Sequence, residues 1–177
     1  SPSKKSGHVY QVSHTAYVRK MAKSFGIRPS SRSETPSKAN IKSLIDELDD
    51  TKKERAIDPK ITAAFRSRVG SALYSARAVR IDIGYVVGML CRCLTYADER
   101  ALRAADDCLA YMAANDDLAL VYDGSQGLHI DAYTDADWSV GPSTTGYVIF
   151  LCVWCTGRMA IDKAEVHFNV VMRVGAH

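Results

Sequence analysis

The sequence predicts an α+β fold, with a mainly helical region followed by three antiparallel strands and one further helix. Two observations support this prediction. Apolar residues recur at spacings of three and four through most of residues 41–114, which is typical of helices that pack one face against a core. After residue 117, short strand-like runs alternate with turn-forming residues. The expected organisation is therefore a segment 1–40, a helical region 41–117 and a region 118–177.

The first 40 residues are expected to contain a strand, a helix and a linker. Residues 9–12 are strand-like, and residues 14–25 place Ala16, Tyr17 and Met21 on one face of a helix. Gly26 suits the position after the last helical turn. Residues 28–40 are rich in Ser, Pro and Lys, which predicts a loop.

Four further helices are expected in the helical region. A narrow apolar stripe predicts a helix within residues 41–55, and two packed helices are expected in the apolar stretch 61–94. Residues 98–114 form the clearest amphipathic pattern, and Asp98 and Glu99 suit the positive end of that helix. The residues expected to face the core are Ile41, Leu44, Ile45, Leu48, Val69, Leu73, Ala76, Ile83, Val86, Val87, Leu90, Leu102, Ala105, Leu109 and Met112.

Region 118–177 is expected to form strands at residues 118–122, 128–134 and 146–153, and a helix at 163–173. The longest apolar run, residues 146–155, is much shorter than the roughly 20 residues of a membrane span. No apolar signal segment follows the first residues, so we expect an intracellular location, cytoplasmic or nuclear, with no membrane partner.

The five cysteines are an odd number, which favours free thiols in a chain that is not secreted. Cys152 and Cys155 have the spacing of half a zinc site or of a redox pair. They stand in an apolar strand-like run without a second pair of ligands at a suitable spacing, so packing in the core is the favoured interpretation.

Charge is distributed unevenly along the chain, although the net charge is only +3. Residues 1–42 carry nine Lys and Arg against one acid, Glu34, while residues 98–137 carry ten acids against Arg100 and Arg103. A basic segment attracts the phosphates of nucleic acid, and a solvated tail is an equal alternative by charge alone. The candidate nucleic-acid-binding residues are Arg19, Lys20, Lys23, Arg28 and Arg32.

The chain contains a series of short motifs, among them FRSRVGSALY at residues 65–74 and RIDIGYVVG at 80–88. These two are similar to YRSLVGSLLY and RPDIAYAVG, and the series as a whole resembles the Pol polyprotein of copia-type LTR retrotransposons. The motifs stand in the family's order and cover roughly residues 8 to 170. The others are YQVSHTAYV at 10–18, FGI at 25–27, ETP at 34–36, DLALVY at 117–122, YTDADW at 133–138 and STTGYV at 143–148.

The resemblance implies a fragment that runs from the end of the reverse transcriptase into the RNase H domain. Residues 1–40 then correspond to the end of the palm and the start of the thumb, residues 41–117 to a thumb or connection-like region, and residues 118–177 to a truncated RNase H-like unit. The family's polymerase carboxylates lie upstream, in a Tyr-x-Asp-Asp hairpin. The Asp-Asp pairs at 49–50, 106–107 and 116–117 do not follow Tyr-x, so we interpret them as carboxylates of helix surfaces or turns.

By the same resemblance, Asp135 matches the first metal-binding carboxylate of RNase H. Magnesium is the family's cofactor. The alternative for Asp135 is an ordinary polar residue at the end of a strand. Asp137 is expected to be structural. His167 stands where the family has its catalytic Glu. Glu165 matches another Glu two residues earlier, which is about 200° away around a helix. Because His167 brings no negative charge to a site for two dications, we expect the fragment to be inactive alone.

Within residues 104–117 the family is usually basic at positions that are Asp106, Asp107, Ala110, Ala113 and Asp116 here. This difference weakens any role of that helix in binding nucleic acid. We expect weak, electrostatic binding to an RNA–DNA hybrid or other nucleic acid, and the remainder of a Pol polyprotein as a partner. The alternatives are an active magnesium-dependent RNase H using Asp135, Glu165 and His167, or a non-catalytic module that binds nucleic acid or another partner through residues 1–42.

Overall fold

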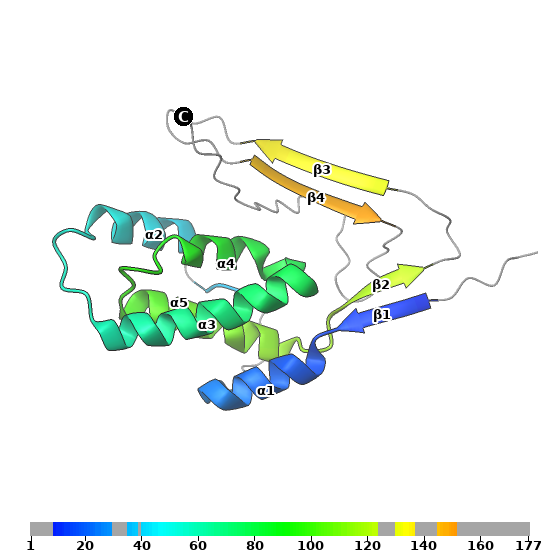
Figure 1. The fold of residues 1–177 in the computed structure, drawn as a ribbon, viewed down its shortest axis with the longest axis horizontal. Coiled ribbons are helices and arrows are strands. Elements are labelled where there is room, and N and C mark those ends of the chain that lie inside the picture. Colours follow the sequence, from blue (N-terminus) through cyan, green and yellow to red (C-terminus); the bar gives the residue numbers. More distant parts are fainter. Residues whose placement is uncertain (1–8, 30–34, 39, 124–129, 137–144, 152–177) are drawn as a thin grey trace, which may run out of the picture. The chain divides into compact units, whose positions relative to one another are not determined.

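The computed structural model describes residues 9–29, 35–38, 40–123, 130–136 and 145–151, with side chains for those between 10 and 121 (Figure 1). The fold is α+β, as predicted. The described helices are α1 (Thr15–Phe25), α2 (Ile41–Asp50), α3 (Pro59–Ala78), α4 (Gly84–Cys91) and α5 (Glu99–Ala114). The described strands are β1 (Val9–Ser13), β2 (Ala119–Asp123), β3 (Ile130–Ala136) and β4 (Thr145–Leu151).

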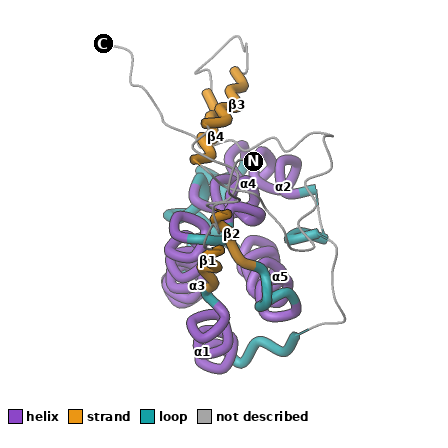
Figure 2. The backbone as a smooth tube through the Cα atoms, turned by 90° about the vertical axis from the view of Figure 1, so that its right-hand side faces the viewer, coloured by secondary structure: helices purple, strands orange, loops and turns teal. Residues whose placement is uncertain are grey.

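The chain divides into two compact units. One contains α1 to α5, within residues 14–116, and the strands belong to the other. In the helical unit, α3 and α5 lie side by side (Figures 1 and 2), and α4 packs against both. A short 3-10 turn (Ile81–Ile83) leads from the end of α3 into α4. Of the helices that the structure describes, none is long and apolar enough to cross a membrane.

Side-chain caps determine where three of the helices begin. The Asn40 side chain accepts a hydrogen bond from the Ser43 N–H at the start of α2 (3.2 Å). Asp58 caps α3 by accepting from the Lys60 N–H (2.7 Å), and Asp98 caps α5 by accepting from the Arg100 N–H (2.9 Å). These short polar side chains satisfy amide groups that have no partner inside the helix.

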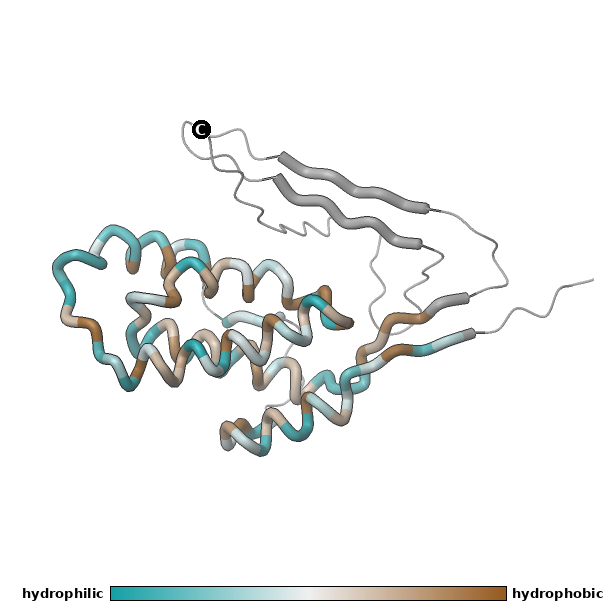
Figure 3. The backbone as a smooth tube through the Cα atoms, in the orientation of Figure 1, coloured by the Kyte–Doolittle hydropathy of each residue, from teal (hydrophilic) through white to brown (hydrophobic). Residues whose placement is uncertain are grey.

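The predicted helices of the helical unit are confirmed, with one difference in extent. The helix expected within residues 41–55 ends at Asp50. Figure 3 shows that the end of α2 and the loop after it are strongly hydrophilic. That loop has no apolar stripe to bury, so extending α2 would gain no packing energy.

Apolar side chains from all five helices form one core. Most of the predicted core-facing residues are buried, and Leu44, Leu73, Ala76 and Leu102 are partly buried.

In α1 the predicted face was wrong at Ala16, which is exposed. Val18, Met21 and Ala22 are the buried residues of α1, because the packed side is turned by part of a helical turn from the predicted one. The largest fully buried apolar side chains are Phe65, Ile45, Leu48, Ile83, Leu90, Leu109 and Met112.

The described strands form two antiparallel two-stranded sheets. β1 pairs with β2, from Val9 opposite Asp123 to Ser13 opposite Ala119. β3 pairs with β4, from Ile130 opposite Leu151 to Ala136 opposite Thr145. Each predicted strand is present, but within the described residues β2 pairs with β1 and not with β3, so one sheet of β2, β3 and β4 is not shown. The helix predicted at 163–173 lies outside the described residues.

Buried thiol and phenol groups link the stability of the helical unit to alkaline pH. Burial raises the pKa of Cys108 to about 12, and burial together with the nearby Asp82 charge raises the pKa of Tyr111 to about 12. Burial also raises the pKa of Cys93 to about 12. These groups bind their protons more tightly in the folded chain than in the unfolded chain, so they stay neutral inside the core up to high pH.

We predict that the free energy of unfolding falls as the pH rises through the alkaline range. The contribution of these groups is complete below the unfolded pKa of a thiol, about 8.5, and is lost as the pH approaches their folded values. Each proton released only on unfolding lowers stability by about 1.4 kcal/mol per pH unit. Urea unfolding measured at a series of alkaline pH values tests this, and Cys108→Ala should reduce the slope. A stability that does not change with alkaline pH would contradict the assignment of these buried groups.

Candidate nucleic-acid interface

The predicted basic residues of the first segment lie on and just after α1. Arg19, Lys20, Lys23 and Arg28 are exposed, and Arg32 lies outside the described residues. The helix ends at Gly26, which adopts a left-handed conformation (φ 67°) that favours glycine. The Ile27 N–H then donates to the Ala22 carbonyl (2.9 Å), which turns the chain away from the helix.

An ion pair attaches α1 to the chain just after α5. The Arg19 Nε donates to the Asp116 carboxylate (2.5 Å), and the Thr15 hydroxyl donates to the Asp116 carbonyl (2.7 Å). Arg19 nevertheless remains 72% exposed. In the part of the chain that the structure describes, no ion pair involves Lys20, Lys23 or Arg28. Among the described residues of this segment, these three cations are therefore exposed and outside any ion pair.

The uneven charge of the sequence is partly neutralised by contacts with α5. Lys38 pairs with Asp107 (3.2 Å), and Arg68 of α3 pairs with Asp106. Arg68 also lies over the ring of Phe25, with its guanidinium carbon 5.1 Å from the ring centroid, so this pair joins three helices. The acids that the sequence places in the middle of the chain thus contact cations from its beginning and from α3.

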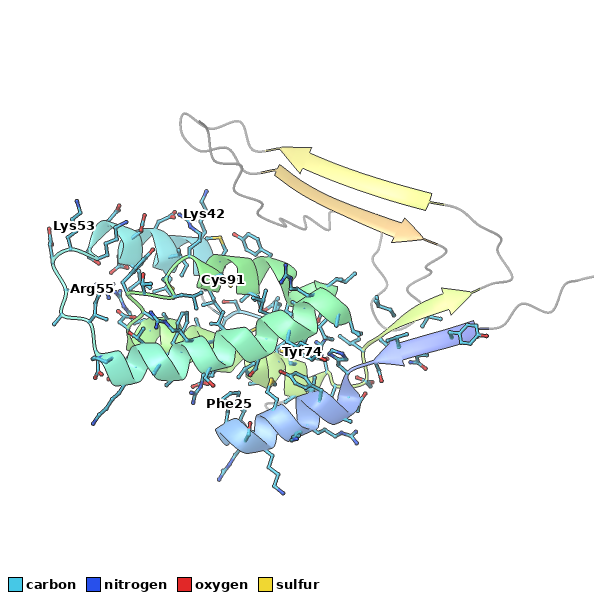
Figure 4. All side chains as sticks on the ribbon, in the orientation of Figure 1. Phe25, Lys42, Lys53, Arg55, Tyr74 and Cys91 are labelled. Atoms are coloured by element: carbon cyan, nitrogen blue, oxygen red, sulfur yellow. The ribbon has the colours of Figure 1, made fainter. Side chains whose placement is uncertain are left out.

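Three aromatic rings gather where α1 meets α3. His14 stacks on Tyr74 with ring centroids 5.5 Å apart and an angle of 14° between the rings, and Tyr17 lies tilted against Tyr74 at 5.0 Å. The His14 Nδ1 lies 3.0 Å from the Ser75 hydroxyl, and the Tyr17 hydroxyl donates to the Ser71 carbonyl (3.1 Å). Tyr74 is 59% exposed, so one side of this aromatic cluster (His14, Tyr17 and Tyr74) faces solvent (Figure 4).

The aromatic cluster continues along the exposed side of α3. Ser67, Gly70, Tyr74 and Arg77 are spaced by three or four residues and are all exposed. A Cβ built on Gly70 would meet nothing within 4 Å, so the helix backbone is open to close approach there. Sequence reasoning missed this surface, but the signal existed: Tyr74 is a large aromatic residue outside the apolar stripe of Val69, Leu73 and Ala76.

A buried ion pair sets the geometry of the neighbouring helix ends. Arg80 is 1% exposed, and its guanidinium donates to both carboxylate oxygens of Asp82 (2.7 and 2.9 Å). Its remaining nitrogen donates to the Asn115 carbonyl (3.0 Å) and, at 3.4 Å, to the Met112 carbonyl at the end of α5. Burial opposes the charge, but the hydrogen bonds and charge of Asp82 outweigh it and raise the pKa of Arg80. Both residues belong to the motif RIDIGYVVG, so this motif has a structural role.

A recess lies near the N-terminal ends of α3 and α5. It has a volume of about 320 Å³ and is lined by Arg55, Tyr96, Asp98 and Arg100, among others. Arg55 donates to the Asp98 carboxylate (2.9 Å) and to the Tyr96 carbonyl (3.2 Å), and Arg100 donates to Asp98 and Glu47. These guanidinium groups hold the loop after α2 in place.

The predicted RNase H residues are placed only in part. Asp135 lies on β3 opposite Gly146, and its side chain lies outside the described part of the chain, as do Asp137, Glu165 and His167. Cys152 and Cys155 also lie outside it. Among the described residues, no group of three His, Cys, Asp or Glu side chains is placed to hold a metal ion. Asp49 and Asp50 lie at the end of α2, and Asp106 and Asp107 lie within α5.

Comparison with known proteins gives one informative similarity. In an alignment 91 residues long that covers 49% of this chain, the sequence is 33% identical to the Retrovirus-related Pol polyprotein from transposon RE1 of Arabidopsis thaliana. This similarity supports a retrotransposon Pol origin. The match covers only 6% of that protein, so the chain corresponds to a small part of it. No family model and no solved structure matches the chain.

We predict that replacing Arg80 with Met destabilises the chain by about 3–5 kcal/mol, because it leaves the buried Asp82 carboxylate without its partner. Arg77→Met removes the same charge from an exposed position on α3 and should change stability by no more than about 0.5 kcal/mol. Urea unfolding of the two variants measures the difference. Equal effects would show that the Arg80 ion pair does not hold the helix ends together.

Proposed function

We propose that the chain is the part of a retrotransposon Pol polyprotein that runs from the end of the reverse transcriptase into the RNase H domain. We further propose that its helical unit binds nucleic acid and that the chain has no catalytic activity alone. The 33% identity to a Pol polyprotein supports the first statement. The observation that carries the second is the exposed aromatic cluster beside the cations of α1.

The cations of α1 suit contacts with phosphates and not with particular bases. Lys20 follows Tyr17 by three residues, so the two are neighbours on the surface of α1, and Lys23 is in turn a neighbour of Lys20. Arg77 follows Tyr74 by three residues on α3. Long, exposed cations of this kind neutralise phosphates without reading sequence, and they give affinities that fall steeply with salt.

The aromatic cluster and the small residues of α3 suit the sugar and base surfaces of the same ligand. Tyr74 presents an exposed ring supported by His14, and nucleic-acid bases and sugars pack readily on such rings. Ser67 and Gly70 carry little or no side chain on the exposed side of α3. A nucleic-acid strand could therefore approach the helix backbone closely beside the Tyr74 ring. Cations at the sides of an aromatic surface are a frequent arrangement in proteins that bind nucleic acid irrespective of sequence.

The proposed RNase H portion keeps Asp135 as its one matched magnesium ligand. In this proposal β3 and β4 are the first strands of the RNase H-like unit, and β3 carries Asp135. When bound, magnesium would activate water and stabilise the leaving oxygen. His167 at the position of the catalytic Glu leaves two dications poorly neutralised, which is why we propose that the chain does not cleave hybrids.

We predict that Lys20→Gln combined with Lys23→Gln weakens binding to an RNA–DNA hybrid about tenfold or more at low salt and makes the salt dependence shallower, because two phosphate contacts are lost. Lys53→Gln combined with Lys60→Gln removes the same charge from the loop after α2 and from the start of α3, outside the basic first segment, and should have a small effect. Fluorescence anisotropy over a salt series measures both. Equal losses from the two pairs would mean that only net charge matters.

We predict that the intact chain does not cleave an RNA–DNA hybrid appreciably with magnesium or manganese. The matched carboxylates are too few to hold two dications. Gel analysis of a labelled hybrid measures cleavage, and Asp135→Asn serves as the control. Robust cleavage that disappears in Asp135→Asn would show that the chain is an active RNase H.

A further inference from the structure

Two carboxylates associated with α5 contact cations of the segment proposed to bind nucleic acid. Asp116, just after α5, lies 2.5 Å from the Arg19 guanidinium, and Asp107 lies 3.2 Å from the Lys38 ammonium. Both cations remain largely exposed, with 72% and 63% of their side chains accessible. The two ion pairs therefore lie at the surface, where a phosphate can reach the same cations.

An ion pair of this kind does not prevent phosphate binding but opposes it. Exposed ion pairs contribute little to stability, so Arg19 and Lys38 can exchange a carboxylate for a phosphate. The carboxylate remains beside the cation after the exchange and repels the bound phosphate. A cation that already has a carboxylate beside it also neutralises less phosphate charge, so binding releases fewer counterions from the nucleic acid.

We infer that Asp107 and Asp116 compete with phosphate for Lys38 and Arg19 and thereby limit the affinity of this chain for nucleic acid. This inference rests on the proposed function, because it assigns a regulating role at the same interface. The partner is a nucleic-acid backbone, recognised by its phosphates. The two aspartates make binding weaker and less dependent on salt than the number of cations alone would give.

A third aspartate, Asp106 on α5, has a different role. Asp106 pairs with Arg68, whose side chain is only 18% exposed and lies over the Phe25 ring. This pair joins α3, α5 and the end of α1, and Arg68 is little accessible to phosphate. Asp106 therefore belongs to the packing of the helical unit, and removing it would not test the inference.

The structure offers a matched control for the two aspartates. Asp46 on α2 pairs with Arg92 at 3.7 Å, and the two side chains are about half exposed (48% and 46%). Asp46→Asn changes the net charge by the same amount as Asp107→Asn or Asp116→Asn. Its partner Arg92 lies after α4, outside the basic first segment, so any effect of net charge alone appears equally in this variant.

The test measures binding of the full 177-residue chain to a labelled RNA–DNA hybrid over a salt series, by fluorescence anisotropy. We expect Asp107→Asn and Asp116→Asn each to tighten binding about three- to tenfold at low salt. Each should also steepen the slope of log binding constant against log salt concentration by up to about one, as for one added phosphate contact. Asp46→Asn should change binding clearly less. Equal tightening by all three variants, or none, would overturn the inference.

A double-mutant cycle between Arg19 and Asp116 makes the test independent of any general change in charge. Arg19→Gln should reduce binding little in the wild-type chain and several-fold more in the Asp116→Asn chain, where Arg19 has no competing carboxylate. An equal reduction in both would overturn the inference for this pair. If circular dichroism shows that Asp116→Asn is unfolded, the same cycle with Lys38→Gln and Asp107→Asn tests the inference instead. A wild-type chain that does not bind at all would overturn the proposed function itself, whereas binding with unresponsive cycles would overturn only this inference.

Discussion

Arg80 holds the ends of three helical segments together from inside the core. It follows the end of α3, pairs with Asp82 in the turn before α4, and donates to carbonyls at the end of α5. A buried guanidinium is costly unless its donors are satisfied. Here the Asp82 carboxylate accepts from it, and so do carbonyls at a helix end, where the last carbonyls have no partner within the helix. The position of Asp116, and with it the attachment of α1 through Thr15 and Arg19, depends on where this network places the end of α5.

The ion pairs of this molecule are of two kinds, one buried and one at the surface. The Arg80 pair is buried and fixes the geometry of the helices, whereas the pairs of Arg19 and Lys38 lie at the surface and leave their cations accessible. Salt screens the first kind much less than the second. If the surface pairs belong to a nucleic-acid interface, as we propose, its affinity depends on the acidic side chains as much as on the basic ones.

Local pattern was enough to predict the helices, and the reason is visible in particular residues. Asp98 and Gly26 mark helix ends through chemistry that the sequence shows directly, and the predicted stripe of α5 corresponds to its buried face. On α3 the predicted stripe lies at the edge of the buried face, because Val69 is buried whereas Leu73 and Ala76 are only partly buried. The burial of Arg80 could not be predicted from hydropathy, because it depends on partners at the far end of another helix. The aromatic cluster and the pairing of β1 with β2 were missed for the same reason, since each joins residues that are distant in the sequence.

The pairing of β1 with β2 has a consequence for the order of folding. Ser13 lies opposite Ala119, so this sheet closes a loop that contains the whole helical unit. Closing so long a loop in an unfolded chain is slow, because a large conformational entropy is lost before any contact forms. Once the helices have folded, the hydrogen bond between Thr15 and Asp116 holds the two flanking segments together, and the strands meet as they would in a hairpin with a short turn. We therefore expect the sheet to form only after the helical unit has folded.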